Sequence, residues 1–350
     1  PVETHDMSHG FMQLVGRYAR IAAAVALSIS LAPAAMAADA GALVSWGSNS
    51  YGEQSPPSDL GSCTSVTGGL YFTAAIRADG IVRAWGYNGY GRCNVPTDLG
   101  ACSQIAASCA NDYAGHILAL TNSGSVRAWG YNGYGQCNVP TNLGACMQIA
   151  AGGASGGFSM AIQTSGAVRA WGYNDQGQCT IPSDIGSCLK IAAGRYHGAA
   201  IQTDGRVRSW GADNYSVLQI PSDLGSCKAI AAAGYSTAVV TNTGAVRVWG
   251  TNEYSQRNVP SDLGVCKQVA VGGDSYYTYI VALQTDGKVR AWGNNWNCQL
   301  CLPTSSPAFG AIGAGMWHGL ALANDCNSNG IADYVDVDSY GALDQNGDKV

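Results

Sequence analysis

Charged residues are scarce in this sequence of 350 residues. Asp, Glu, Lys and Arg together form 12% of it, and there are only five His. Residues 38–324 contain 15 basic and 15 acidic side chains, so the net charge of −5 comes entirely from residues 325–350. Because nucleic-acid binding requires a basic stripe that neutralises phosphates, this balance argues against nucleic acid as a partner.

The sequence also lacks helical periodicity, and it has no long apolar run after residue 37. A transmembrane helix needs about 20 consecutive apolar residues, so none is predicted in the mature chain. The chain contains 47 Gly, and a helical repeat would lose about 1 kcal/mol at each interior Gly relative to Ala. Apolar residues still reach 47%, which is enough for a large core in a chain with many tight turns.

Residues 1–37 have the pattern of a secretory signal peptide. Arg17 and Arg20 precede the apolar run Ile21–Leu31, and small residues follow up to residue 37. We therefore expect cleavage before residue 38 and a mature chain that is secreted or held in the cell envelope.

The pair Trp-Gly recurs at intervals of 39 to 44 residues, which indicates one repeated unit. Two short apolar runs separated by an Asp-Gly or Ser-Gly type of turn precede it, which is a β-hairpin signal. A loop rich in Asn, Gly and Tyr and then a Pro follow it, which suits an edge strand or a connector. Three or four short strands per unit predict β-propeller blades, since a β-helix coil is shorter and helical repeats need amphipathic helices. The repeated residues are Trp46, Trp85, Trp129, Trp171, Trp210, Trp249 and Trp292.

The two ends of the repeat region complete one another. Residues 42–47 supply only the last strand of a unit, whereas residues 303–324 supply its earlier strands and stop before a Trp-Gly strand. We therefore predict an all-β fold, a seven-bladed β-propeller closed by pairing the N-terminal strand with the C-terminal blade. Such closure leaves no long open sheet edge. The expected order is a signal peptide (1–37), the propeller (38–324) and an acidic tail (325–350).

The unit from Ile191 to Gly211, with Ile-Ala-Ala-Gly, His, Asp-Gly and Trp-Gly in order, resembles the repeat of the regulator-of-chromosome-condensation family. The resemblance covers residues 42–324 and implies a rigid wheel whose face loops bind other proteins. The family's founder is a nucleotide exchange factor for a nuclear GTPase, and secreted bacterial relatives include protein-binding inhibitors; no exchange residues carry over. The His of the motif recurs at His116 and His318, but Ser236 replaces it elsewhere, which favours a structural hydrogen-bonding role.

An Arg stands two residues before the Trp in most units, where strand alternation places both side chains on the same face. These Arg residues are candidates for a ligand-binding ring. Most units also have an acid near the Pro, such as Asp98, Asp184, Asp223 or Asp262, so we favour internal Arg–Asp or Arg–Trp contacts instead. The Arg residues are Arg83, Arg127, Arg169, Arg208, Arg247 and Arg290.

Tyrosines follow Trp-Gly in several loops and form the candidate binding face. Tyr and Asn together with Gly suit a surface that binds protein or stacks against carbohydrate, whereas packing within the loops is the alternative. The sequence leaves both interpretations open. The candidate residues are Tyr87, Tyr90, Tyr131, Tyr134, Tyr173 and Tyr254.

The 13 Cys agree with an exported chain. Three units share the spacing Cys-x8-Cys, which predicts one disulfide in each. Cys298 and Cys301 predict a local disulfide rather than half of a metal site, since no second pair accompanies them. The candidate pairs are Cys93–Cys102, Cys137–Cys146 and Cys179–Cys188. The unmatched Cys63, Cys227 and Cys266 are expected to be buried thiols.

The acidic tail has the ligand pattern of a calcium loop. It places side-chain oxygens at positions 1, 3, 5, 9 and 12, a main-chain carbonyl at position 7 and a Gly at position 6, which is the all-oxygen set that Ca²⁺ prefers. The stretch resembles the loops of dockerins, EF-hands and thrombospondin type 3 repeats, with Asp in place of Glu at position 12; an acidic disordered tail is the alternative. A partial second copy at residues 344–348 predicts that the tail is truncated. The predicted ligands are Asp325, Asn327, Asn329, Ile331, Asp333 and Asp336.

The sequence therefore predicts a secreted, monomeric β-propeller that binds an extracellular protein or glycan through its face loops and performs no catalysis. One alternative is a secreted hydrolase or lyase acting at the central funnel, which would require acids or His clustered at one rim. The other is a structural or self-associating envelope component. The dispersed His and Asp favour the binding scaffold, with Ca²⁺ in the tail as the expected cofactor.

Overall fold

The computed structural model describes residues 40–109, 115–154, 156–303 and 308–325. They all lie in one compact region. This part of the chain consists of β-strands and two short 3-10 turns, η1 (Gly89–Gly91) and η2 (Asn214–Ser216). Among the described residues, no helix is both long and apolar enough to cross a membrane. The predicted signal peptide lies outside these ranges.

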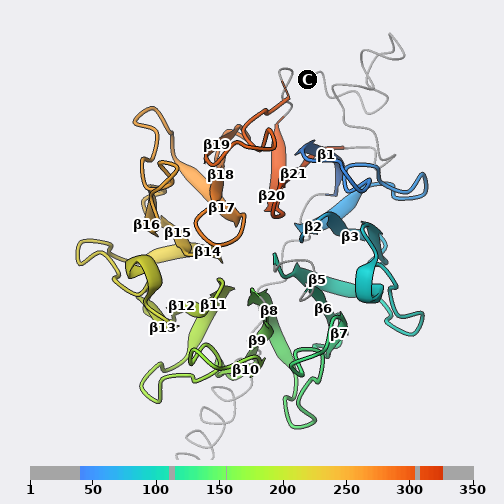
Figure 1. The fold of residues 1–350 in the computed structure, drawn as a ribbon, viewed down its shortest axis with the longest axis horizontal. Helices are drawn as coiled ribbons and strands as arrows, with labels where there is room; N and C mark the ends of the chain where they lie inside the picture. Colours follow the sequence, from blue (N-terminus) through green and yellow to red (C-terminus); the bar gives the residue numbers. More distant parts are fainter. Residues whose placement is uncertain (1–39, 110–114, 155, 304–307, 326–350) are drawn as a thin grey trace, which may run out of the picture. The chain divides into compact units, whose positions relative to one another are not determined.

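The strands form antiparallel units of three, in which the chain runs through an innermost, a middle and an outer strand (Figure 1). Five units are separate sheets, and the sixth sheet joins two units in the order β20-β21-β1-β2-β3-β4. The innermost strands are β2 (Cys63–Gly68), β5 (Cys102–Ala107), β8 (Cys146–Gly153), β11 (Cys188–Ala193), β14 (Cys227–Ala233), β17 (Cys266–Gly272) and β20 (Phe309–Ala314). The middle strands are β3 (Phe72–Arg77), β6 (His116–Thr121), β9 (Gly157–Gln163), β12 (His197–Gln202), β15 (Ser236–Thr241), β18 (Tyr279–Gln284) and β21 (His318–Asn324). The outer strands are β4 (Val82–Gly86), β7 (Val126–Gly130), β10 (Val168–Gly172), β13 (Val207–Gly211), β16 (Val246–Gly250), β19 (Val289–Gly293) and β1 (Gly41–Gly47).

The N-terminal strand β1 completes the unit of β20 and β21. This pairing was predicted from the incomplete units at the two ends of the repeat region. Strand β1 pairs antiparallel with β21 along its whole length, from Gly41 opposite Asn324 to Gly47 opposite His318. Its pairing with β2 is limited to Gly41 opposite Cys63. The innermost strands also contact one another in chain order, and β20 contacts β2. The first and last units are therefore neighbours.

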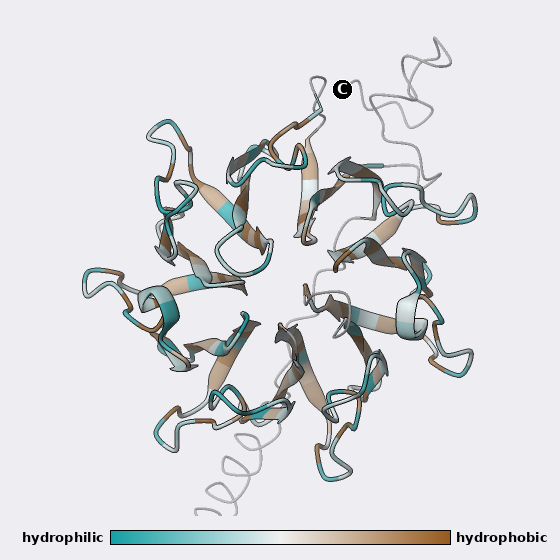
Figure 2. Cartoon of the chain, in the orientation of Figure 1, coloured by the Kyte–Doolittle hydropathy of each residue, from teal (hydrophilic) through white to brown (hydrophobic). Residues whose placement is uncertain are grey.

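The hydrophobic core lies between neighbouring units. One cluster packs Phe72 and Ile76 of one unit against Ile105, Ile117 and Trp129 of the next. Figure 2 shows the hydrophobic residues concentrated on the strands and the hydrophilic residues in the connecting loops. Burial of this kind contributes about 25 cal/mol per Å² of apolar surface, so the contacts between units stabilise the whole body.

Each repeated Trp also forms a hydrogen bond to the unit before its own. The buried indole of Trp129 donates from Nε1 to the carbonyl oxygen of Arg92 at 2.9 Å. The same contact recurs in every unit, as Trp46–Gln299, Trp85–Glu53, Trp171–Gln136, Trp210–Gln178, Trp249–Val217 and Trp292–Gln256. The Trp-Gly repeat is thus explained by packing between units.

The predicted Arg–Asp contacts are confirmed. Arg127 Nη2 lies 2.9 Å from an oxygen of Asp98, and this hydrogen bond lowers the pKa of the Asp98 carboxyl. Arg169 is exposed, and Asn142 stands where the other units have the Asp. These side chains therefore do not form a ligand-binding ring. The remaining pairs are Arg83–Asp59, Arg208–Asp184, Arg247–Asp223 and Arg290–Asp262.

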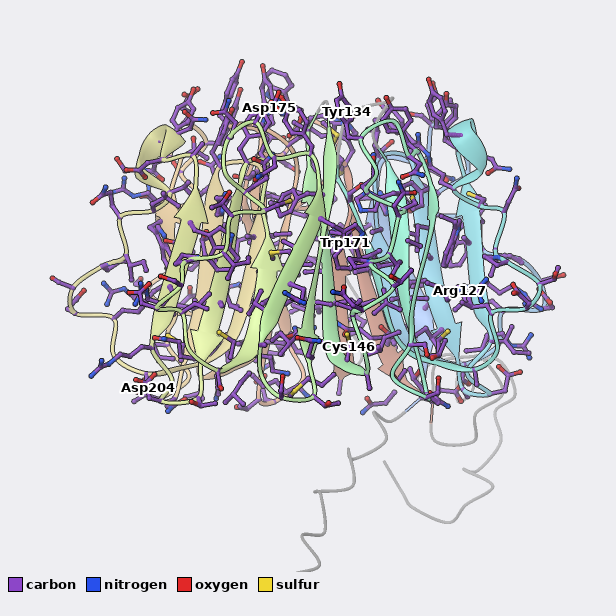
Figure 3. The ribbon with its side chains drawn as sticks, turned by 90° about the horizontal axis from the view of Figure 1, so that it is seen from below. Arg127, Tyr134, Cys146, Trp171, Asp175 and Asp204 are labelled. Carbon is purple, nitrogen blue, oxygen red and sulfur yellow. A yellow bond between two sulfur atoms is a disulfide. The ribbon has the colours of Figure 1, made fainter. Side chains whose placement is uncertain are left out.

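The three predicted Cys-x8-Cys disulfides are not formed. The thiols of Cys93, Cys102, Cys137, Cys146, Cys179 and Cys188 are all free. In one such unit, Cys137 lies in the loop after the Trp-Gly strand, where its thiol donates to the carbonyl of Tyr131. Cys146 begins the next innermost strand, toward the opposite face (Figure 3). The prediction was wrong because the eight intervening residues run from one end of the strands toward the other instead of closing a short loop.

The other cysteine predictions are confirmed. Cys298 and Cys301 are joined by a disulfide. Cys63, Cys227 and Cys266 are buried free thiols, as expected for residues without a Cys at the paired position. Burial raises the pKa of the Cys63 thiol to about 12, so it stays protonated near neutral pH.

Candidate functional site: an aromatic belt on one face

Two sets of loops meet at one face of the body. One set follows the outer strands, and the other connects each innermost strand to its middle strand. In Figure 3, Tyr134 and Asp175 of the first set lie at this face, whereas Asp204, in the turn between a middle and an outer strand, lies at the other. We call these the belt face and the turn face.

The loops after the outer strands are held rigidly by their own polar side chains. In the loop after β7, the Asn132 side chain accepts a hydrogen bond from Cys137 N at 2.8 Å. Gln136 is fully buried, and its Oε1 accepts from Tyr134 N at 2.9 Å. Gly130 starts the loop with a φ of 102°, where a Cβ would meet the carbonyl oxygen of Gly115 at 2.9 Å. These contacts hold the backbone of the loop that carries Tyr134.

Aromatic side chains from both sets of loops form the aromatic belt. Their ring centroids lie 4.3 to 6.5 Å apart in tilted or edge-to-face arrangements, the geometry that aromatic pairs prefer. Among the described residues, these contacts link the rings into two runs. The first run is Tyr51, Tyr71 and Tyr87. The second run is Tyr90, Tyr131, Tyr134, Tyr173, Tyr196, Tyr235, Tyr215, Tyr276, Tyr277, Tyr254, Trp296 and Trp317.

The belt is unusually open to solvent for aromatic residues. Tyr51, Tyr90, Tyr134 and Tyr215 are 52%, 53%, 46% and 46% exposed, and Trp296 is 65% exposed. Four of these occupy the same position of the repeat, five residues after the Trp. Exposed aromatic surface of this kind makes the belt a candidate binding surface.

Two arginines lie behind the rings of the belt. The fully buried Arg92 guanidinium lies 5.1 Å from the ring centroid of Tyr87. Arg195 lies 5.3 Å from the ring centroid of Tyr196 and forms an ion pair with the buried Asp274. Cation–π contacts of this kind help to hold the rings in place.

Exposed acids lie among the belt residues. Burial and the nearby Asp175 carboxylate raise the pKa of Tyr173. Burial and the charge of the nearby Glu253 carboxylate raise the pKa of Tyr215. The belt therefore combines neutral rings with negative charge.

All six tyrosines predicted from the sequence belong to the belt. They make ring contacts with one another and with neighbours, so loop packing and surface exposure occur together. The sequence analysis missed the residues between the innermost and middle strands. Their signal was a recurring aromatic residue just before the position that His197 occupies in its unit, at Tyr71, Tyr196, Tyr235 and Trp317.

The buried histidines connect neighbouring units. His197 Nε2 lies 2.9 Å from Thr237 Oγ1 of the next unit, and His318 Nε2 lies 2.9 Å from Thr73 Oγ1. His116 Nε2 lies 3.0 Å from Ser159 Oγ in the same way. Burial lowers the pKa of His197 to about 4, so its ring is neutral at physiological pH. This agrees with the structural role predicted for the histidines.

The innermost strands line a central cavity of about 260 Å³. Gln104 of this lining bonds to both the N–H and the carbonyl of Ile149 on the next strand. Among the described lining residues, the ionisable side chains are Cys109 and Asp274. Asp274 is paired with Arg195, and burial raises the pKa of Cys109 to about 12. The described lining therefore holds no pair of carboxyl groups for general acid–base catalysis.

The calcium prediction falls almost entirely outside the described residues. Asn327, Asn329, Ile331, Asp333 and Asp336 are not among them. Asp325 is described: it is buried, and its carboxylate accepts a hydrogen bond from the Ser62 hydroxyl. Elsewhere in the described ranges, no group of three or more His, Cys, Asp or Glu could hold a metal ion.

Comparison with known proteins supports the family that the repeat resembles. Residues 63–92, 104–136 and 189–216 match the Regulator of chromosome condensation (RCC1) repeat. Each match begins at or near an innermost strand and ends in a loop of the belt face. No curated protein sequence matches the chain.

Solved structures share the fold at low sequence identity. Prp20p from Saccharomyces cerevisiae is 16% identical, with a TM-score of 0.66, over 87% of this chain and 96% of that one. Human WBSCR16 is 18% identical, with a TM-score of 0.65, over 82% and 99%. The ectodomain of the Physcomitrella patens receptor kinase CR4 is 21% identical, with a TM-score of 0.57, over 71% and 66%. The repeated three-stranded sheets are thus typical of RCC1-like propeller blades.

Proposed function

We propose that this chain is an exported, non-catalytic, seven-bladed propeller that binds an extracellular protein through the aromatic belt. The belt carries the proposal, because it is a large exposed aromatic surface with a regular spacing. The RCC1-like fold supports it as well. The yeast relative Prp20p is described by its binding to Gsp1p and histones, and yeast RCC1 by its complex with Kap60.

The physical chemistry of the belt suits protein recognition. A few hot-spot residues dominate the binding energy of protein interfaces, and they are enriched in Tyr, Trp and Arg. The Tyr134 loop is already fixed by Gln136 and Asn132, so binding would cost little conformational entropy. The Tyr134 loop therefore offers an aromatic anchor at a small ordering cost.

A protein partner is favoured over a glycan by how the loop asparagines are used. Sugar hydroxyls need free donors and acceptors beside the stacking ring. Asn88 Oδ1 accepts from Cys93 N, and Asn88 Nδ2 donates to Asn94 Oδ1 at 2.8 Å. Asn132 and Asn138 repeat this pair in the next unit. These amides are occupied within the loop, which leaves ring faces and edges as the main contact surface.

Closure of the propeller is part of the proposal. It is supported by the seven-residue pairing of β1 with β21 and by the contact of β20 with β2. The indole of Trp46 also repeats, at this joint, the bond that Trp129 makes elsewhere. A closed body holds the two ends of the belt in fixed positions.

An enzyme acting at the central funnel receives no support from the described lining, whose ionisable groups are the ion-paired Asp274 and the protonated Cys109. A self-associating envelope component is the remaining alternative. It predicts that the chain binds its own belt, so the apparent mass in analytical ultracentrifugation would rise with concentration.

Export and calcium binding are further parts of the proposal that depend on the sequence alone. Residues 1–37 support export through their signal-peptide pattern. The oxygen ligands of residues 325–336 support Ca²⁺ binding. N-terminal sequencing of the exported protein should begin at residue 38, and a calcium titration should change the circular dichroism of the tail.

The binding proposal is tested by affinity capture from the secreted and envelope fractions of the source cells, with calcium and with chelator. The belt variant replaces Tyr51, Tyr90, Tyr134 and Tyr215 by Ser. Its matched control replaces three exposed apolar residues at the turn-face end of the innermost strands by Ser: Met147, Leu189 and Val265.

We expect the belt variant to lose about 10-fold or more of the captured partner, while the control captures as much as the wild type. Both variants should keep the wild-type melting temperature. Equal capture by the belt variant and the wild type would contradict the proposal. Loss with chelator alone would move binding to the tail.

A further inference from the structure

Tryptophan occurs in one sector of the belt. Among the described belt residues, the tryptophans are Trp296, in the loop after β19, and Trp317, in the loop between β20 and β21. The Tyr277 ring contacts both, with ring centroids 4.7 and 6.3 Å apart. It also contacts Tyr276 at 4.3 Å and Tyr254 at 5.5 Å. These five residues, from three neighbouring units, form the Trp296 cluster.

The two tryptophans of the cluster keep free hydrogen-bond donors. Each repeated tryptophan donates from Nε1 to a carbonyl oxygen of the preceding unit. By contrast, neither the Trp296 nor the Trp317 indole donates to another described residue. The Tyr277 hydroxyl donates to the Tyr276 hydroxyl at 3.1 Å, and no described residue accepts the Tyr276 hydrogen. Because an indole N–H can only donate, the cluster suits a ligand that presents acceptors.

The loop that carries Trp296 is held in place by its own residues. The disulfide between Cys298 and Cys301 closes part of it. Asn294 Oδ1 accepts hydrogen bonds from Trp296 N and from Nε2 of the buried Gln299, both at 3.2 Å. The Trp296 side chain is nevertheless 65% exposed. A ligand would therefore meet an open ring on a backbone that needs little further ordering.

The sector has no excess of charge of either sign. The loop of Tyr254 carries one exposed acid, Glu253, and one exposed base, Arg257. Residues 293–302 contain no charged side chain, and Asp274, in the loop of Tyr276 and Tyr277, is ion-paired with Arg195. Since charge complementarity guides the choice of partner, this balance favours an uncharged ligand segment.

We propose that the Trp296 cluster binds a proline-rich segment of the protein partner in the polyproline II conformation. Such a segment has no internal hydrogen bonds, so its carbonyl oxygens are free acceptors, and Pro has no N–H to donate. Its preformed helix loses little entropy when it docks on aromatic side chains. Trp296, Trp317 and Tyr276 donate to its carbonyls, and the rings pack against its pyrrolidine rings. This inference rests on the proposed binding function and names the chemistry of one contact.

The test is an NMR titration of the purified chain with acetylated octaproline. A Gly-Ser peptide of the same length is the control, and cellohexaose tests whether the cluster prefers a neutral glycan. The reporters are the indole N–H signals of Trp296 and Trp317, each assigned by its absence in Trp296→Phe or Trp317→Phe. The indole signals of the repeated tryptophans show whether each variant keeps its fold. The binding variants are Trp296→Ala and Trp296→Phe, and Tyr90→Ala is the matched control, since Tyr90 is 53% exposed and lies outside the cluster.

We expect octaproline to shift both reporter signals to saturation and the Gly-Ser peptide to leave them in place. Trp296→Ala, followed through the Trp317 signal, should lower the affinity about 10-fold or more. Trp296→Phe keeps a ring but removes the donor and should lower it about 3-fold. Tyr90→Ala should not change it.

Four results would overturn the inference: no shift with octaproline, an equal shift with the Gly-Ser peptide, tighter binding of cellohexaose, or an affinity for octaproline that is the same in Trp296→Ala and Tyr90→Ala. The belt variant of the capture experiment replaces none of the five cluster residues, so the two proposals can fail separately. If octaproline does not bind while the belt variant still loses the protein partner, the proposed function stands. If the belt variant keeps the partner, the proposed function fails whatever octaproline does.

Discussion

Trp46 donates a hydrogen bond from Nε1 to the carbonyl oxygen of Gln299 at 2.7 Å, although 253 residues separate them. The six other repeated tryptophans make this bond to the preceding unit in chain order. Trp46, near the start of the described residues, makes the same bond to Gln299, near their end. The first and last units of the repeat region are therefore joined by the same contact that joins neighbouring units elsewhere.

Replacing Trp46 by Phe tests this joint. Trp46 is 4% exposed, so the change leaves a buried carbonyl without its donor and creates a small void. We expect a loss of about 1–3 kcal/mol in the free energy of unfolding, measured by urea denaturation. Trp171→Phe is the matched control within the repeat region and should cost a similar amount. A neutral Trp46→Phe beside a destabilising Trp171→Phe would mean that the joint is open.

The buried histidines should make stability depend on pH. Burial lowers the pKa of His197 and of His318 to about 4, whereas a His in the unfolded chain titrates near 6.5. Between these values the unfolded chain binds more protons, so stability is present above about pH 6.5 and is lost as the pH falls toward 4, by up to about 3 kcal/mol per His. Urea denaturation at pH 4.5 and 7.5 measures the difference.

A double variant isolates one histidine from the acidic residues that also titrate. His197→Phe with Thr237→Ile installs the residue types that Phe72 and Ile117 supply at the equivalent positions. We expect this variant to lose less stability between pH 7.5 and 4.5 than the wild type. An unchanged pH dependence would show that His197 is charged or exposed in the folded protein.

The cysteine connectivity can be checked by mass spectrometry. Peptide mapping without reduction should find Cys298 linked to Cys301 and no Cys-x8-Cys link. Because burial raises the pKa of Cys137 and Cys179 to about 12, iodoacetamide at pH 8 should modify them far more slowly in the folded protein than in urea. A Cys137–Cys146 peptide would contradict the described path of the chain.

The missing Arg–Asp pair offers a small stability test. Arg127 forms an ion pair with Asp98, whereas Asn142 stands at the equivalent position for Arg169. Asn142→Asp should raise the melting temperature slightly, within about 2 °C, and Asp98→Asn should lower it by a similar amount, because exposed ion pairs contribute little. Calorimetry at low and high salt measures both, and the differences should shrink in high salt.

The fold was predictable because its signals are local and repeated. Trp-Gly and Asp-Gly mark the end and the turn of each hairpin, and the incomplete first and last units indicated that β1 would pair with β21. The disulfides were not predictable from spacing, because Cys137 and Cys146 are close in sequence but lie toward opposite faces. The distance between the two cysteines depends on the direction in which the eight intervening residues run. The sequence spacing does not specify that direction.

The belt was predicted only in part for a similar reason. Tyr87 and Tyr134 follow Trp-Gly in obvious loops, so they were identified as surface residues. Tyr196 and Tyr235 lie just before middle strands and resemble core residues in the sequence. Only the antiparallel order of the strands brings both kinds of loop to one face, where ring contacts join them.

The central claim, that the partner binds the belt face, is tested most directly by site-specific photocrosslinking. A photoreactive phenylalanine is placed at Tyr90 or Tyr215 on the belt face, or at Met147 or Leu189 on the turn face, and the chain is irradiated with the captured partner. The account predicts crosslinks from Tyr90 and Tyr215 and none from Met147 and Leu189. Crosslinks from the turn-face positions alone would contradict it.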